Sequence, residues 1–191
     1  MAVAHKLKDL DDLLALGEDA RAELVNGDLC GIETSGEHSD AQAQMTGFLQ
    51  PHFGRPARRD DGPPGGWWIY VESTIAFSLR DVLRPDVAGW RRDRVPSRPT
   101  GFPVRELPDW VCEVLSPSTA RRDLNEKRRV YHAAKVGHYW VIDLEKETLT
   151  ALRWSLDGYV IVAVHGPGEL ARIEPFEAME FPVGVVFGRE E

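Results

Sequence analysis

The stretch Trp110-Val111-Cys112-Glu113-Val114-Leu115 places a single carboxylate inside an otherwise apolar run. Side chains alternate between the two faces of a strand, so Glu113 shares a face with Val111 and Leu115, and the opposite face is also apolar. A strand that is apolar on both faces is usually central in its sheet and covered on both sides. An ionised carboxylate at such a position costs several kcal/mol unless a cation compensates its charge. Glu113 therefore needs a partner.

A lysine lies on the helix that we expect to follow this strand, over Thr119–Lys135. The helical spacing that connects Leu124, Lys127, Tyr131 and Ala134 places these four residues on one stripe. A lysine normally occupies the solvated face of a helix, so its place in this stripe predicts that Lys127 points toward the sheet that carries Glu113. The alternative is a structural ion pair between Glu113 and an arginine, which would need no functional site.

A second carboxylate begins another apolar run, in Arg84-Pro85-Asp86-Val87-Ala88. Two carboxylates and one inward lysine are what hydrolysis of a phosphodiester requires. Carboxylate oxygens together with retained waters are the ligands that Mg²⁺ prefers. The metal offsets the charge that develops on phosphorus, and a nearby lysine can orient or deprotonate the attacking water or stabilise the oxyanion. The sequence thus predicts a magnesium site on Asp86 and Glu113, assisted by Lys127.

The other periodic segments predict an α/β fold with a mixed central sheet flanked by helices. Lys6–Leu16 and Asp40–Phe53 carry apolar residues at helical spacing. Ala22–Cys30 contains Asn26-Gly27, a pair that readily adopts the positive φ angles of a hairpin turn. Strands are expected over Trp67–Leu79, Val82–Trp90, Trp110–Leu115, His138–Leu144, Thr148–Trp154 and Gly158–His165. The helix between the third and fourth of these strands predicts that they are parallel neighbours.

The length of 191 residues suits a single domain over 1–191. Hydrophobic residues make up 42% and charged residues 28%, which is typical of a soluble globular protein. Charged residues interrupt the leucines of the N-terminal segment, so neither a signal peptide nor a membrane span is expected. Two cysteines are too few for a disulfide framework or a zinc site, and the cytoplasm is the expected compartment.

The net charge of −8 argues against a protein that coats nucleic acid, because non-specific affinity depends on neutralising phosphates. The arginines nevertheless gather in three places, around Arg55–Arg59, Arg80–Arg105 and Arg121–Arg129. A mixed solvated surface explains these clusters better than a continuous track for phosphates does.

A series of motifs follows the chain in a characteristic order: Pro85-Asp86, then Glu113-Val114-Leu115-Ser116-Pro117-Ser118-Thr119, then Asp123, Lys127 and Tyr131, and finally Tyr139-Trp140-Val141-Ile142-Asp143. This order resembles the Uma-type restriction endonuclease family, which belongs by fold to the PD-(D/E)XK nuclease superfamily. The segment Glu23–Leu29 is similar to the opening hairpin of that family, and His38 is similar to the histidine that begins its next helix. The resemblance extends from about Leu7 to Trp154.

The resemblance implies a restriction-endonuclease-like fold and a Mg²⁺-dependent endonuclease acting on DNA, for which Mn²⁺ could substitute. Asp86 and Glu113 would bind the metal. The lysine of the superfamily normally follows the glutamate by two positions, where this chain has Leu115. In the Uma-type family it moves onto the next helix, in agreement with an inward Lys127. Nucleases of this fold often cut as pairs, so a homodimer is plausible by analogy.

The resemblance also assigns supporting roles. Glu23 would be a further catalytic acid near the metal, although a solvated residue of the hairpin is an equal alternative. His38 would be a nearby polar group, and Tyr131 would belong to the same site. Asp123 lies one helical turn before Lys127 and could hold it through an i,i+4 pair.

The chain departs from the family pattern after the helix. A glycine and a later glutamate commonly precede the Tyr-Trp pair, and Lys135 and His138 stand there instead. The glycine would have been the easiest left-handed helix stop, a role that Gly137 could take two residues later.

Two other functions remain open beside the endonuclease. One is a non-catalytic nucleic-acid-binding or regulatory module that keeps the nuclease fold, which the acidic net charge favours. The other is a hydrolase that acts on a different phosphoester through the same chemistry. Retention of Asp86, Glu113 and Lys127 together favours the enzyme, because an inactive site has no reason to keep a costly buried trio.

Overall fold

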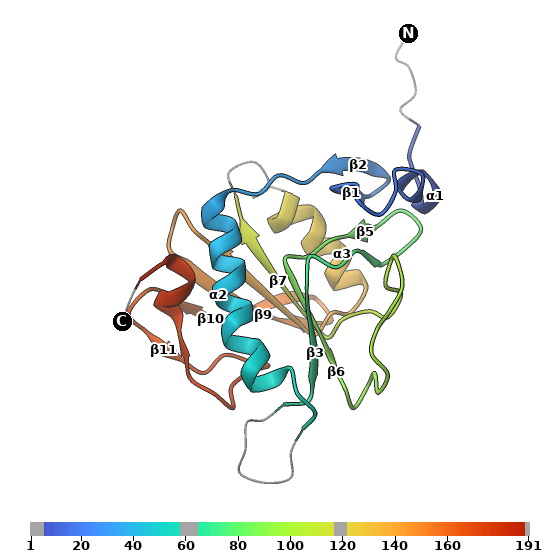
Figure 1. The fold of residues 1–191 in the computed structure, drawn as a ribbon. Coiled ribbons are helices and arrows are strands. Elements are labelled where there is room, and N and C mark those ends of the chain that lie inside the picture. Colours follow the sequence, from blue (N-terminus) through green and yellow to red (C-terminus); the bar gives the residue numbers. More distant parts are fainter. Residues whose placement is uncertain (1–5, 58–64, 117–121, 190–191) are drawn as a thin grey trace.

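The computed structural model describes residues 6–57, 65–116 and 122–189, with the backbone alone for Arg122 and Asp123. Its centre is a six-stranded mixed sheet with the strand order β10-β9-β8-β7-β6-β3 (Figure 1). The strands are β3 (Trp67–Val71), β6 (Val87–Arg91), β7 (Trp110–Leu115), β8 (His138–Asp143), β9 (Thr148–Ser155) and β10 (Gly158–His165). The predicted α/β architecture, with a mixed central sheet flanked by helices, is confirmed.

Strand β7 is central, and all six of its residues are buried. It pairs antiparallel with β6, where Cys112 lies opposite Val87. It pairs parallel with β8, where Glu113 lies opposite Val141. The predicted parallel strand pair joined by a helix is therefore confirmed. Because β6 and β7 are antiparallel, Asp86 just before β6 reaches the same end of the sheet as Glu113.

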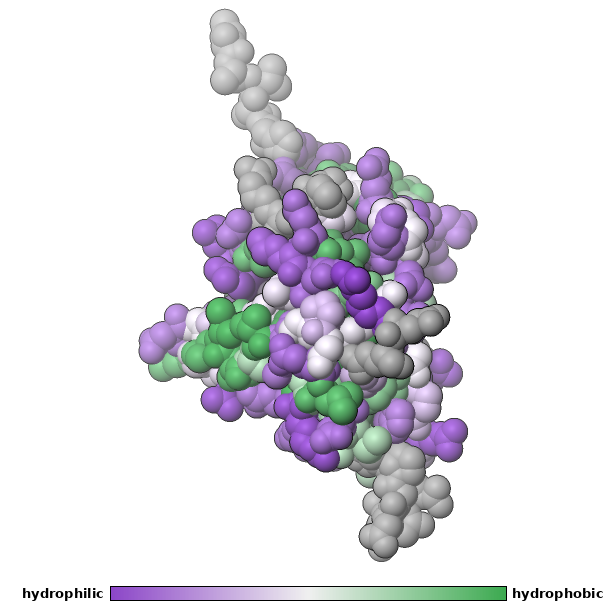
Figure 2. All heavy atoms as spheres, turned by 90° about the vertical axis from the view of Figure 1, so that its left-hand side faces the viewer, coloured by the Kyte–Doolittle hydropathy of each residue, from purple (hydrophilic) through white to green (hydrophobic). Residues whose placement is uncertain are grey.

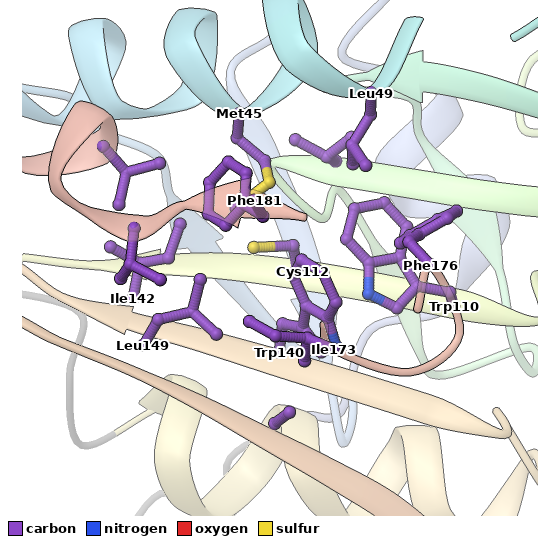
Figure 3. Packing of buried hydrophobic residues seen from close by; sticks show 14 of the residues in the cluster. Met45, Leu49, Trp110, Cys112, Trp140, Ile142, Leu149, Ile173, Phe176 and Phe181 are labelled. Atoms are coloured by element: carbon purple, nitrogen blue, oxygen red, sulfur yellow. The ribbon is translucent and has the colours of Figure 1, made fainter. Parts of the chain in front are cut away.

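Helix α2 (Gly36–Phe53) covers one face of the sheet. Figure 3 shows how Met45 and Leu49 of this helix pack onto Trp110 and Cys112 of β7. Ser35 caps the helix by accepting a hydrogen bond from the backbone amide of His38, so the helix begins earlier than the expected Asp40. The C-terminal segment completes this layer with β11 (Leu170–Ala171), β12 (Phe181–Pro182) and the 3-10 helix Val183–Phe187.

The C-terminal segment contributes one aromatic ring to the centre of this core. Phe176 is 3% exposed, and its ring centroid lies 4.7 Å from that of Phe53 and 5.0 Å from that of Trp110. It also contacts Trp67 and Trp140. Segments far apart in the sequence thus meet at one side chain.

We expect Phe176→Ala to lower the free energy of unfolding by about 3–5 kcal/mol, because truncating a buried phenylalanine leaves a cavity. Leu170→Ala is the matched control. Leu170 lies in the same segment but is 64% exposed, so its truncation should change stability by less than about 0.5 kcal/mol. Chemical denaturation measures both values. Equal small effects would show that the C-terminal segment does not belong to the core.

The opposite face is covered by a π-helix, Arg122–Lys127, that continues into α3 (Arg128–Ala133). The expected helix over Thr119–Lys135 is present, but its first part is a π-helix and it ends at Ala133 instead of Lys135; its expected start at Thr119 lies outside the described residues. Lys135 itself adopts the left-handed conformation, with φ 57°, so the helix stop falls there and not at Gly137.

A smaller four-stranded sheet with the order β2-β1-β5-β4 lies beside this layer. Its strands are β1 (Ala22–Val25), β2 (Asp28–Gly31), β4 (Ile75–Ala76) and β5 (Val82–Leu83). The predicted β1–β2 hairpin is confirmed, with φ 52° at Asn26 and 85° at Gly27. The expected strand Trp67–Leu79 is divided into β3 and β4 at Glu72, which has φ 45°. The expected strand Val82–Trp90 is divided into β5 and β6 by the segment 84–86.

Helix α1 (Leu10–Leu14) is shorter than the predicted Lys6–Leu16. Asp9 caps it by accepting hydrogen bonds from the amides of Asp11 and Asp12, which sets the first turn there. Lys8 lies before the helix, and its amide donates to the carbonyl of Gly27 at 2.8 Å. Within the part of the chain that the structure describes, no helix is long and apolar enough to cross a membrane.

Candidate functional site

A small cavity lies at the end of β7 that carries Glu113, and β1, α2 and the π-helix also contribute to its lining. Its volume is about 20 Å³, which is room for one water-sized occupant. Most of its lining is polar: Glu23, Ile32, Glu33, Thr34, His38, Arg84, Asp86, Glu113, Val114 and Lys127. The structure thus brings together five of the predicted site residues, from Glu23 near the start of the chain to Lys127.

Glu113 is 2% exposed, and two residues of the facing helix donate hydrogen bonds to its carboxylate. The amine of Lys127 lies 3.2 Å from both carboxylate oxygens. The hydroxyl of Tyr131 donates to Oε1. Burial, and then the negative charge of Glu113, raise the pKa of the Tyr131 hydroxyl well above its usual value, so it remains a donor. Among the described residues, a buried partner of Glu113 is Lys127, as its helical stripe predicts.

Glu23 contributes a second buried carboxylate from β1, and it is fully buried. Its Oε1 lies 2.8 Å from the amine of Lys127 and accepts a hydrogen bond from the backbone amide of Arg84 at 2.7 Å. Lys127 therefore lies between two carboxylates that belong to different sheets. The alternative of a solvated Glu23 is wrong, because the hairpin turns this side chain inward.

Asp86 provides the third buried carboxylate and is held in place by its neighbours. Its Oδ2 accepts a hydrogen bond from the amide of Val114 at 2.7 Å and lies 3.2 Å from Nε2 of His38. The side-chain amide of Gln42 donates to the backbone carbonyl of Asp86 at 2.7 Å. His38 and Gln42 are one turn apart on α2, so this helix fixes both the side chain and the backbone of Asp86.

The cluster contains oxygen ligands of the kind that a divalent cation takes. Three buried carboxylates, Glu23, Asp86 and Glu113, line the cavity together with the ammonium of Lys127 and the partly exposed Arg84. Among the described residues, no group of three or more His, Cys, Asp or Glu side chains is arranged to hold a metal ion through the protein alone. Mg²⁺ instead takes one or two carboxylates and keeps several waters. Asp86 and Glu113 could hold such an ion, and the cavity beside them has the size of one small occupant.

Two site residues were not predicted from the sequence, and one predicted residue cannot be placed. Gln42 is a polar residue on the buried stripe of α2 between Ala41 and Met45, and that position was the available signal. Arg84 lines the cavity directly before Pro85, and no sequence signal separated it from the other arginines. The side chain of Asp123 lies outside the described residues, so its proposed pairing with Lys127 remains a prediction.

The arginines at the other end of β6 are bound by the protein itself. Arg94 forms two hydrogen bonds to the carboxylate of Asp109, at 2.6 and 2.9 Å. Arg92 stacks on the ring of Trp68 at 3.5 Å and donates to backbone carbonyls. This end of the sheet is far from Glu113, so these arginines form a mixed, internally paired surface as expected.

An acidic groove of about 720 Å³ adjoins the cavity and shares Glu33 and Thr34 with it. Its floor includes Leu115 and its rim carries several carboxylates; the described lining is Glu33, Thr34, Ser35, Glu37, Leu115, Ser116, Leu124, Asp143, Leu144, Glu145 and Lys146. Four carboxylates against one lysine make this groove an unfavourable path for a phosphate backbone.

Comparisons with known proteins identify the family and the fold of the chain. A sequence model of the Uma2 family, described as "Putative restriction endonuclease", matches residues 7–184. No curated protein matches the chain. Among solved structures, the chain is similar to one described as a putative nuclease belonging to DUF820 from Anabaena variabilis, with a TM-score of 0.72 and 18% sequence identity. That similarity covers 94% of this chain and 97% of the other, and it establishes a common fold.

Proposed function

Because the chain belongs to the Uma2 family of restriction-endonuclease-like proteins, we propose that it is a metal-dependent endonuclease that hydrolyses phosphodiester bonds of DNA. The observation that carries this proposal is that three buried carboxylates line one small cavity with Lys127, which pairs with two of them, Glu23 and Glu113. Burying such a cluster is costly for the fold, and removing one member of a buried charge pair usually costs more still. A site that binds a metal cation and an anionic substrate would explain why these charged side chains are buried.

In this proposal Asp86 and Glu113 hold Mg²⁺, for which Mn²⁺ substitutes. The bound metal would supply Lewis-acid stabilisation of the phosphoryl oxygens and a more acidic water. Val114 and His38 orient the carboxylate of Asp86, and Tyr131 orients that of Glu113. These hydrogen bonds fix the ligands before substrate arrives, so little reorganisation is needed during the reaction.

Lys127 has the role of holding the attacking water and stabilising the charge that develops on the phosphate. Its ammonium donates to Glu113 and lies within 2.8 Å of Glu23, so it is fixed at the wall of the cavity. A positioned cationic donor acts strongly in a site from which bulk water is excluded. Glu23 keeps this lysine in place and would act as an additional acid near the metal.

A non-catalytic binding module is the second candidate, and one observation favours it. The net charge is −8, and the arginines at the far end of β6 are paired with carboxylates and carbonyls. A nuclease with these properties would bind its substrate mainly through the site itself. A homodimer, which would place two sites on the two strands of a duplex, is part of the proposal and is tested by sedimentation.

The proposal is tested by incubating the purified protein with supercoiled plasmid, single-stranded DNA and RNA in Mg²⁺, Mn²⁺ or EDTA. We expect nicking of plasmid that requires the divalent metal. Hydrolysis of RNA alone would change the substrate class and keep the chemistry. Absence of hydrolysis at every metal concentration, with metal binding intact, would favour the binding module.

A further inference from the structure

Arg84 lines the same cavity as the three carboxylates and Lys127. Its backbone amide donates to Oε1 of Glu23 at 2.7 Å, which fixes the start of its side chain beside the buried cluster. The side chain is 22% exposed, so it can be reached from solvent. Arg84 is therefore a cation that borders both the cavity and the surface.

The guanidinium of Arg84 has donors that the protein does not satisfy. A guanidinium carries five N–H donors. Among the described residues, the Arg84 guanidinium makes one hydrogen bond, from Nη2 to Oε2 of Glu72 at a long 3.4 Å. Its Nε is buried and has no hydrogen-bond partner in the part of the chain that the structure describes. A planar guanidinium with unused N–H donors is suited to bind an acceptor group that has two oxygens, such as a phosphate.

Glu72 is fixed beside Asp86 in an unusual backbone conformation. Its φ of 45° is in the left-handed region, which is unfavourable for a residue with a side chain. The amide of Glu72 donates to the carbonyl of Asp86 at 3.1 Å and helps to hold this conformation. Its carboxylate contacts Arg84 and Arg21, each at 3.4 Å. Long, partly exposed ion pairs of this kind contribute little to stability, so Arg84 can leave Glu72 for a stronger acceptor.

We infer that Arg84 binds a non-bridging oxygen of a nucleic-acid phosphate, and that Glu72 is its counter-ion while the site is empty. The inference rests on the proposed function, because it states how that site holds its anionic substrate. The structural alternative is that Arg84 only ties β5 to the segment after β3. Arg21 provides the matched control, since it contacts the same Glu72 but does not line the cavity.

The test measures fluorescence anisotropy of a short labelled DNA oligonucleotide in EDTA, and hydrolysis of the same DNA with Mn²⁺. We expect Arg84→Gln to weaken binding by about tenfold or more, because a charge-assisted hydrogen bond is lost. Arg21→Gln should bind as the wild type does. Glu72→Gln should bind more tightly, because it removes the competing carboxylate. Melting curves confirm that each variant is folded, and Glu72→Gln decides the question if Arg84→Gln does not fold.

Each result separates the two proposals. Equal binding by wild type and Arg84→Gln, or no binding by the wild type, would overturn the role of Arg84. Loss of binding in Arg84→Gln without hydrolysis by the wild type would support Arg84 and contradict the nuclease. If hydrolysis occurs, guanidinium ion added to Arg84→Ala should restore part of the rate. Urea has the same shape without the charge, and an equal effect of urea would contradict the inference.

Discussion

Replacing Glu113 with glutamine should abolish Mn²⁺ binding and reduce DNA hydrolysis by about three orders of magnitude, since the metal supplies several kcal/mol of transition-state stabilisation. Glutamine keeps the shape of the side chain, and its carbonyl can still accept from Tyr131. The loss would therefore report the missing charge and not a collapsed site. Calorimetry with Mn²⁺ measures the binding, and a plasmid-nicking assay measures the rate.

Glu145→Gln is the control for Glu113→Gln. Glu145 is an exposed carboxylate of the neighbouring acidic groove and does not line the cavity. Its replacement should leave both metal affinity and nicking unchanged. The reverse pattern, with metal binding lost in Glu145→Gln and kept in Glu113→Gln, would move the metal site into the groove.

Replacing Lys127 with methionine should have two separate effects. Hydrolysis should fall by about two orders of magnitude or more, because the positioned donor is lost. The metal-free protein should also lose roughly 3–5 kcal/mol of stability, because Glu23 and Glu113 would remain buried without their common cation. Saturating Mn²⁺ should restore much of this stability, since a ligand that binds only the folded state stabilises it. Nicking should remain slow in the restored protein.

Arg129→Met provides the comparison for Lys127→Met on the same helix. Arg129 is exposed, so its replacement should leave melting temperature and nicking close to those of the wild type. A Lys127→Met protein that is as stable as the wild type in EDTA would contradict the buried ion pairs. A protein that Mn²⁺ restores to full nicking would show that Lys127 is a structural residue only.

The sequence was sufficient to predict the central strand and the contact between Glu113 and Lys127. The apolar residues on both sides of Glu113 predicted a buried strand, and the helical stripe through Lys127 and Tyr131 predicted which residues would face it. These contacts could be predicted because hydrophobic patterning and helical periodicity are local properties that can be read directly from a sequence. The Asn26-Gly27 turn was equally readable, since few residue pairs accept two positive φ angles.

Other features depend on tertiary contacts that the sequence does not show. The π-helix before α3 has no local pattern that separates it from an α-helix. The left-handed Glu72 divides a strand whose composition is continuous, and its conformation is supported by the distant carbonyl of Asp86. The position of Gln42 against Asp86 also follows from how α2 packs on the sheet. Propensity does not predict such long-range hydrogen bonds.

The most direct test of the metal site is a crystal structure of the protein soaked with Mn²⁺, with data collected for the anomalous signal of manganese. We expect one strong peak in the cavity, within coordination distance of carboxylate oxygens of both Asp86 and Glu113, and no peak in an Asp86→Asn crystal. A peak among the carboxylates of the acidic groove, or a cavity without a peak at saturating Mn²⁺, would contradict the metal site on which the proposed nuclease depends.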